Sequence, residues 1–339
     1  MSKNVYNIVW ADDEIDAILD EELLACLKEQ GIYIVGKAHD GQELETILDQ
    51  SNHVDAVIVD ANFNATDKTT SSERDTSGLI SAMGLYLYKY KKEIPFFLIT
   101  SRSDSMLKEI YKHNKNFETT FPRHKRWFIK NDSDEFNDML NEMKKAVEET
   151  RTPKFIITNR YRDEINASKF VDDITYKFVL EFLIKDYMGV LITIDEPFVK
   201  MRKTVERIFT KCQNWNLIPP IGNDVNGTAG YFLHENYRIQ ISETPKEYKY
   251  IYVMDIPIME KPLAKAFDNM VDIIQDASHN KEGLKYKVDE YYSKTKDTLF
   301  LKSTMYILID FIKWFASTSL IHHDREQNAK ELWTKVDKE

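Results

Sequence analysis

Short apolar runs recur along the first part of the chain, and a chemically reactive side chain stands at the end of each. The runs and their end residues are Val5–Trp10 with Asp12 and Asp13, Val57–Asp60 with Asp60 itself, Phe96–Ile99 with Thr100, and Trp127–Ile129 with Lys130. Apolar runs of this length are typical of strands. Apolar residues after the first run recur at helical spacing, at Ile15, Ile18, Leu19, Leu23 and Leu27. The pattern favours an open parallel α/β sheet.

The reactive side chains should meet in one pocket, because the carboxyl ends of parallel strands line a single edge of such a sheet. That pocket would hold the three carboxylates of Asp12, Asp13 and Asp60. Crowded carboxylates repel one another unless a cation neutralises them, and an all-oxygen site with few protein ligands suits Mg²⁺ better than zinc or a caged calcium. The alternative is that these aspartates cap helices, with Asp13 or Glu14 capping the helix that follows.

In order and spacing, the segment from Val5 to Val147 resembles the receiver domain of two-component response regulators. The resemblance implies a flavodoxin-like, doubly wound sheet of five parallel strands. It also implies a role for each reactive residue: Asp12 and Asp13 as the acidic pair that places Mg²⁺, Asp60 as the phosphoryl acceptor, Thr100 as the switch hydroxyl, Lys130 as the phosphoryl-contacting lysine and Trp127 as the switch aromatic.

Membership of this family would make the chain a phosphoprotein that receives its phosphoryl group from a histidine kinase or a phosphotransfer protein. The chemistry needs an ionised nucleophile, a metal and an opposing cation, which Asp60, Mg²⁺ and Lys130 would supply. The expected metal ligands are Asp13 and Asp60 directly, Asp12 through water, and the backbone carbonyl of Asn62. No enzymatic activity is expected beyond phosphorylation and dephosphorylation of the receiver itself.

Two segments depart from the usual receiver pattern. Residues 64–76 form a polar stretch without apolar periodicity, which predicts an inserted loop beside the pocket. A second extension, Lys112–Lys125, lengthens the crossover between Thr100 and Lys130.

The domain boundary is predicted near Glu148–Lys154, where Pro153 forbids simple continuation of the preceding helix. This division gives a receiver domain at 1–150 and a mainly helical output or dimerisation domain at 151–339. Helices are expected at Tyr176–Tyr187, Pro197–Trp215 and Thr298–Ser319, with a loop and a small hairpin or flap between Asn216 and Tyr252. The last helix is apolar around much of its circumference, so it is either buried centrally or shared in a homodimer.

Charge is distributed unevenly between the two parts. Residues 1–150 contain 18 basic and 28 acidic side chains, a net charge of −10, whereas residues 151–339 contain 28 of each. This balance argues against a nucleic-acid-binding output, because phosphate neutralisation requires basic residues. The two cysteines, Cys26 and Cys212, are far apart and suggest a reducing cytoplasm. Asp310 and Lys313 interrupt the most apolar stretch, so neither a signal peptide nor a membrane span is predicted.

The second part is faintly similar to HEPN-type helical bundles at Met201–Phe209, Ala277–Asn280 and Leu301–Phe315. The Arg-x4-His motif of the nucleolytic members is absent, since no histidine has an arginine five positions before it. A basic cluster at Lys200, Arg202, Lys203 and Arg207 is interpreted as a solvated helix face.

Two functions remain consistent with the sequence. The first is a response regulator of a two-component phosphorelay, in which phosphorylation of Asp60 controls a helical output that acts through protein–protein contact or dimerisation. The alternative is a receiver-controlled output that binds nucleic acid or cleaves RNA. The sequence identifies neither the cognate kinase, nor the output target, nor the direction of the switch.

Overall fold

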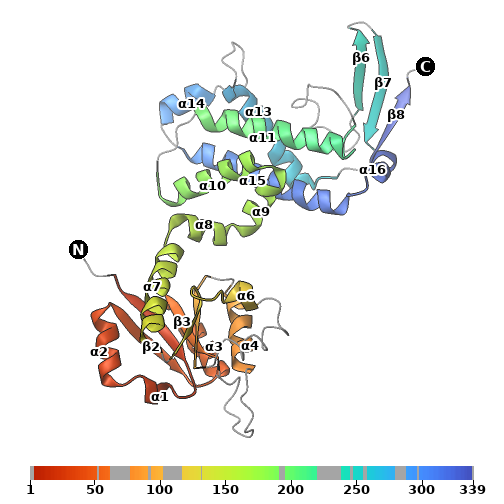
Figure 1. Ribbon diagram of the computed structural model, residues 1–339. Helices are drawn as coiled ribbons and strands as arrows, with labels where there is room; N and C mark the ends of the chain where they lie inside the picture. Colours follow the sequence, from red (N-terminus) through yellow and green to blue (C-terminus); the bar gives the residue numbers. More distant parts are fainter. Residues whose placement is uncertain are drawn as a thin grey trace. The chain divides into compact units, whose positions relative to one another are not determined.

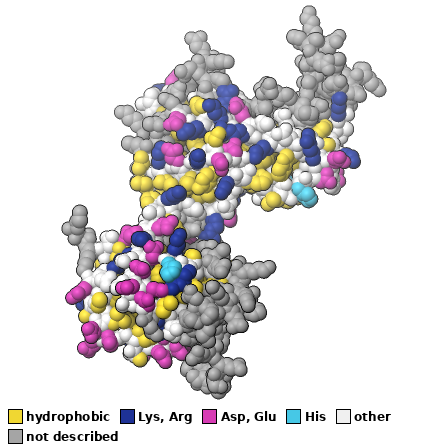
Figure 2. All heavy atoms as spheres, in the orientation of Figure 1, with side chains coloured by type: hydrophobic (Ala, Val, Ile, Leu, Met, Phe, Trp, Pro, Cys, Tyr) yellow, Lys and Arg dark blue, Asp and Glu magenta, His cyan; other side chains and the backbone are white. Residues whose placement is uncertain are grey.

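The computed structural model describes residues 4–51, 53–61, 77–90, 93–101, 117–130, 132–190, 195–219, 238–244, 247–254, 258–278, 288–295 and 298–337. The chain divides into two compact units, Met1–Asn159 and Arg160–Glu339 (Figure 1). Figure 2 shows that acidic side chains gather on the visible face of the first unit, whereas acidic and basic side chains are mixed on the second. The 64–76 loop and the first part of the predicted extension, residues 112–116, lie outside the described residues, whereas residues 117–125 are described.

The first unit is built on five parallel strands. In chain order these are β1 (Tyr6–Ala11), β2 (Ile32–Ala38), β3 (Ala56–Asp60), β4 (Phe96–Thr100) and β5 (Trp127–Ile129). Their order across the sheet is β2-β1-β3-β4-β5, and every pairing is parallel. The predicted α/β layout is therefore confirmed, and this strand order is compatible with a flavodoxin-like domain.

Helices cover both faces of this sheet. They are α1 (Ile15–Ile18), α2 (Glu21–Glu29), α3 (Gly41–Gln50), α4 (Ser77–Gly84) with the π-helical turn η1 (Leu85–Lys89), α6 (Phe117–Thr120) and α7 (Ser133–Thr150). In Figure 1, α2 and α7 lie on one side of the sheet and α3 and α4 on the other. Alternate residues of a strand point to opposite faces of the sheet. In β3, Val57 and Val59 pack with α3 and α4, while Ile58 packs with α7 on the other face. All residues of β3 and β4 are buried.

The second unit is mainly helical. Helix α8 (Pro153–Arg160) lies at the end of the first unit. The helices of the second unit are α9 (Arg162–Val171), α10 (Asp173–Tyr187), α11 (Asp195–Asn214), α13 (Lys261–Ser278), α14 (Val288–Thr295), α15 (Leu299–Ile321) and α16 (Arg325–Glu331). The strands β6 (Arg238–Thr244) and β7 (Glu247–Met254) form the antiparallel hairpin that was predicted. The C-terminal strand β8 (Trp333–Asp337) pairs with β7, and the sequence pattern did not predict this third strand.

Helix α15 is the core of the second unit. It contacts α9, α11 and α13, and Phe311 at its centre stacks on Phe267 with ring centroids 4.1 Å apart. By length and composition α15 could cross a membrane, but 56% of its most apolar window is buried inside the protein, so it is weak evidence for a span. Central burial within the unit explains its apolar circumference without a second subunit.

Candidate metal centre

The predicted site residues share one edge of the first sheet. Asp12 follows β1, Asp60 ends β3, Thr100 ends β4 and Lys130 follows β5. Backbone hydrogen bonds continue the parallel ladder past the strand ends: the Asp12 amide donates to the carbonyl of Ala38 (2.9 Å) and the Lys130 amide to the carbonyl of Thr100 (2.7 Å). The strands therefore bring together residues that are up to 118 positions apart in the chain.

Three carboxylates converge at this edge. Asp12, Asp13 and Asp60 each offer an oxygen, and these oxygens lie within 4.8 Å of one another. Asp12 and Asp60 are buried, with 0% and 3% of their surface exposed, whereas Asp13 is exposed. The arrangement matches the acidic pocket that the sequence pattern predicts, and such a buried acidic cluster could bind a metal ion.

Hydrogen bonds fix the Asp12 carboxylate at the base of the cluster. Its Oδ1 accepts from the backbone N–H of Glu14 (3.0 Å), and its Oδ2 accepts from Lys130 Nζ (2.7 Å). The side chain of Lys130 is only 18% exposed, so this ion pair is largely removed from solvent. Three carboxylates and one ammonium group leave a formal charge of −2 in a small volume.

A divalent cation would neutralise this charge. The donor set consists of carboxylate oxygens, and hard cations such as Mg²⁺ and Ca²⁺ take oxygen ligands. Asp12 and Asp60 are buried, and a further cation at this site would offset the cost of holding ionised carboxylates away from water. The residues present therefore fit a hard divalent cation held by Asp12, Asp13 and Asp60.

Helix capping does not explain the cluster. Among the described residues of the first unit, the aspartates whose side chains cap helices are Asp20 for α2, Asp40 for α3 and Asp132 for α7. The N-cap residue of α1 is Glu14, whose side chain makes no capping hydrogen bond. Glu14 therefore occupies the N-cap position considered for it, but without a side-chain cap, and the predicted apolar pattern is divided between α1 and a second helix that Asp20 caps.

The remaining predicted residues differ in their surroundings. Thr100 is fully buried at the site edge. Trp127 is 5% exposed and packs in the hydrophobic core on the α3 and α4 face, with the Arg123 guanidinium 4.8 Å from the centre of its ring. Asn62, predicted to offer its carbonyl to the metal, lies outside the described residues.

A charged brace that the sequence analysis missed supports β5 just before Lys130. Glu135 accepts two hydrogen bonds from the Arg123 guanidinium (2.7 and 2.5 Å) and one from the backbone N–H of Ile129 (2.7 Å). The Arg123 guanidinium is the main cause of the lowered pKa of the Glu135 carboxyl. In the sequence, Glu135 lies three residues after Asp132, the N-cap residue of α7, and this spacing is typical of a capping box. That spacing could have indicated a structural role for Glu135.

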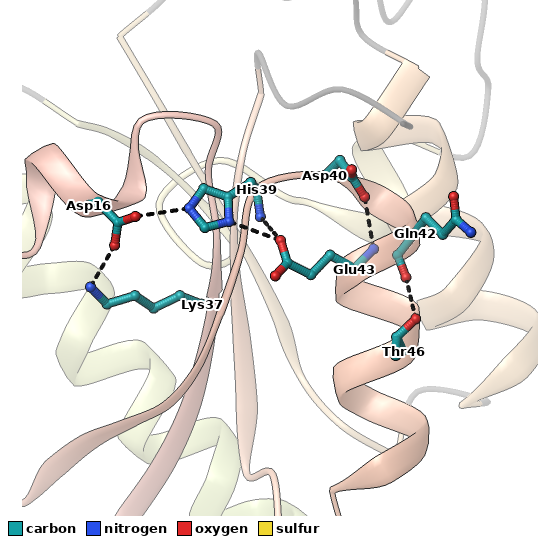
Figure 3. A network of polar contacts seen from close by, with 7 residues as sticks. All are labelled: Asp16, Lys37, His39, Asp40, Gln42, Glu43 and Thr46. Carbon is teal, nitrogen blue, oxygen red and sulfur yellow. Dashed lines mark hydrogen bonds and ion pairs between the residues drawn. The ribbon is translucent and has the colours of Figure 1, made fainter. Parts of the chain in front are cut away.

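A second network lies at the neighbouring end of β2 (Figure 3). The His39 ring contacts Glu43 through Nδ1 (2.9 Å) and Asp16 through Nε2 (3.1 Å), and Lys37 pairs with the same Asp16 carboxylate (2.9 Å). Hydrogen bonding to Glu43, and then to Asp16, raises the pKa of His39. The network ties α1 to β2 and α3 beside the acidic cluster.

Comparison with known proteins does not assign the chain to a family. No protein-family model matches the chain, and a search of curated proteins finds no match. The functional argument therefore depends on the residues and their arrangement.

Proposed function

We propose that this protein is a response regulator of a two-component phosphorelay, with Asp60 as its phosphoryl acceptor and Mg²⁺ as its metal. One observation carries the proposal: the buried Asp60 carboxylate lies within 4.8 Å of both Asp12 and Asp13, at the same strand edge as Thr100 and Lys130. Structural ion pairs alone would not require three carboxylates at one point. A phosphoryl group also needs the cation that Lys130 provides.

In the proposed reaction an Asp60 carboxylate oxygen attacks the phosphorus of a phosphohistidine on the partner kinase or phosphotransfer protein. The new P–O bond forms as the P–N bond breaks, and the released imidazole takes a proton from solvent. Mg²⁺ held by Asp12, Asp13 and Asp60 would neutralise part of the charge on the transferred group. Water later hydrolyses the acyl phosphate and returns the free carboxylate.

Phosphorylation would change the contacts of two neighbouring groups. The dianionic phosphoryl group would compete with Asp12 for the Lys130 ammonium, which now lies 2.7 Å from the Asp12 carboxylate. It would also accept a hydrogen bond from the Thr100 hydroxyl. These contacts would bias an existing equilibrium in the segment after β4 and at Trp127, and so change the protein–protein contacts or dimerisation of the helical unit.

The test is to mix the full-length protein with acetyl phosphate and Mg²⁺ and to measure its intact mass and its size in solution. We expect one added phosphoryl group, which should not form when EDTA replaces Mg²⁺ or when Asp60 is changed in Asp60→Asn. Asp138→Asn makes the same change at an exposed position of α7 and should be phosphorylated normally.

Different results would contradict different parts of the proposal. An unmodified wild-type protein, or a phosphoryl group that persists in Asp60→Asn, would overturn the assignment of the acceptor. Salt-sensitive binding of random RNA by the phosphorylated form, or RNA cleavage, would replace the protein–protein output with a nucleic-acid output.

A further inference from the structure

A groove runs between α10 and α11 in the second unit. Ile174, Lys177 and Phe178 line it from α10, and Lys200, Lys203 and Arg207 line it from α11, around a cavity of about 310 Å³. On both helices the lining residues are three, four and seven positions apart, which is the spacing of one helical face. Two cation-bearing faces therefore lie opposite each other.

Most charges in the groove have partners, but two do not. Lys200 pairs with Glu196 (2.7 Å) and Arg207 with Asp172 (3.6 Å). Lys177 and Lys203 are both exposed, and within the part of the chain that the structure describes neither forms an ion pair or a hydrogen bond. The cations left without a counter-charge stand on opposite walls.

The groove has little negative charge of its own. The carboxylate in its lining is Glu181, and that group forms an ion pair with Lys185 at 2.6 Å. Four cations and one carboxylate line the groove, so it has a local positive charge within a unit whose net charge is near zero. Three of these cations, Lys200, Lys203 and Arg207, belong to the cluster that the sequence analysis interpreted as a solvated helix face, because Glu206 interrupts it on a helix with its own apolar stripe.

An apolar surface lies beside these cations. Phe178 is 8% exposed at the base of the groove, with Lys200 Nζ 5.8 Å from its ring centre. Ile174 is 61% exposed at the end of the lining. A ligand that combines an anionic group with an apolar group would match both features at once.

We propose that this groove binds a small organic phosphate monoester with an aromatic or apolar substituent. The phosphate would lie between Lys177 and Lys203, and the substituent would cover Phe178 and Ile174. The cavity volume falls at the lower end of the range of small-molecule sites. A long nucleic acid fits less well, because residues 151–339 contain 28 basic and 28 acidic side chains and the uncompensated cations are confined to one groove.

The experiment is a calorimetric titration of the full-length protein with 1-naphthyl phosphate, in EDTA so that no metal is held at the acidic cluster. Inorganic phosphate, 1-naphthol and a single-stranded RNA dodecamer serve as comparison ligands. We expect naphthyl phosphate to bind more tightly than any of these. Lys177→Glu/Lys203→Glu should weaken its binding at least about tenfold, since both charged contacts to the phosphate are lost.

The matched control is Lys169→Glu/Lys265→Glu, which makes the same charge change at two exposed helix positions outside the groove. It should bind naphthyl phosphate as the wild type does. If the groove variant does not fold, Lys177→Gln/Lys203→Gln removes the same two charges without reversing them.

Every other result overturns the proposal. Absent binding, or an equal loss in groove and control variants, means that the groove is not the site. If inorganic phosphate binds as tightly as naphthyl phosphate, the apolar substituent contributes nothing to binding. If 1-naphthol binds as tightly, the phosphate group contributes nothing. If the RNA binds more tightly than naphthyl phosphate, the groove is a nucleic-acid site. Asp60→Asn should bind naphthyl phosphate normally, so this test can fail or succeed independently of the phosphorelay.

Discussion

Replacing Asp60 by Asn should stabilise the metal-free protein, although it removes the proposed phosphoryl acceptor. Unit charges 4.8 Å apart repel by roughly 3.5 kcal/mol at an effective dielectric constant of about 20. Lys130 pairs with Asp12 at 2.7 Å and so offsets part of the repulsion that involves Asp12. Asp13 is exposed, and solvent screening reduces the expected gain to roughly 1–2 kcal/mol.

The assay is scanning calorimetry of the full-length protein in EDTA and in Mg²⁺. For the first unit, this gain in unfolding free energy corresponds to a Tm about 5 °C higher for Asp60→Asn than for the wild type in EDTA. Magnesium at about one hundred times its Kd would stabilise the wild type by about 2.7 kcal/mol, and Asp60→Asn by much less. Asp138→Asn should change neither value.

Two results would refute the reasoning about this cluster. If Asp60→Asn is less stable than the wild type in EDTA, the carboxylates do not repel one another as their spacing implies. If Mg²⁺ raises the Tm of both proteins equally, the cation binds elsewhere.

Three further predictions concern the surrounding structure. Glu135→Gln should destabilise the protein by about 2 kcal/mol at pH 7 in urea unfolding, because it weakens the bonds from Arg123. Since the pKa of Glu135 is lowered, this loss should shrink as pH falls below about 4.5, and a loss independent of pH would contradict it. Phe311→Ala should cost about 3–5 kcal/mol in urea unfolding through a cavity in the core of the second unit, whereas a loss below about 1 kcal/mol would exclude central burial. His39→Gln should lower Tm at pH 6 but not at pH 9: the raised pKa of His39 means that its pairing with Glu43 stabilises below pH 6.5 and is lost as pH rises. This side chain is half exposed, so the effect should stay below about 1 kcal/mol, and an equal loss at both pH values would contradict it.

The sequence predicted β1, β3, β4 and β5 because each is short, apolar and followed or ended by a polar residue. It did not single out β2, whose residues are only partly buried, and a fifth strand was expected only from the resemblance to receiver domains. The same pattern predicted the acidic pocket, since parallel strands have only one carboxyl edge. It did not reveal the brace between Glu135 and Arg123, whose residues are 12 positions apart and meet only once β5 and α7 are packed.

The second unit shows the limit of local patterns more clearly. Periodicity predicted the hairpin and the apolar terminal helix, but the pairing of β8 with β7 joins segments about eighty residues apart in the chain. Composition left open how α15 covers its apolar surface, and the structure shows that it packs against α9, α11 and α13 within the second unit.

By itself, then, the sequence determined which residues can form strands and helices and which chemical groups stand at their ends, because hydrophobic periodicity and short-range geometry are local properties. Only the tertiary structure decided how close those groups come and which charges keep a partner. Lys130 meets Asp12 at 2.7 Å, and Lys177 faces α11 across a groove. Both depend on strand order and helix packing, which sequence-distant contacts determine collectively.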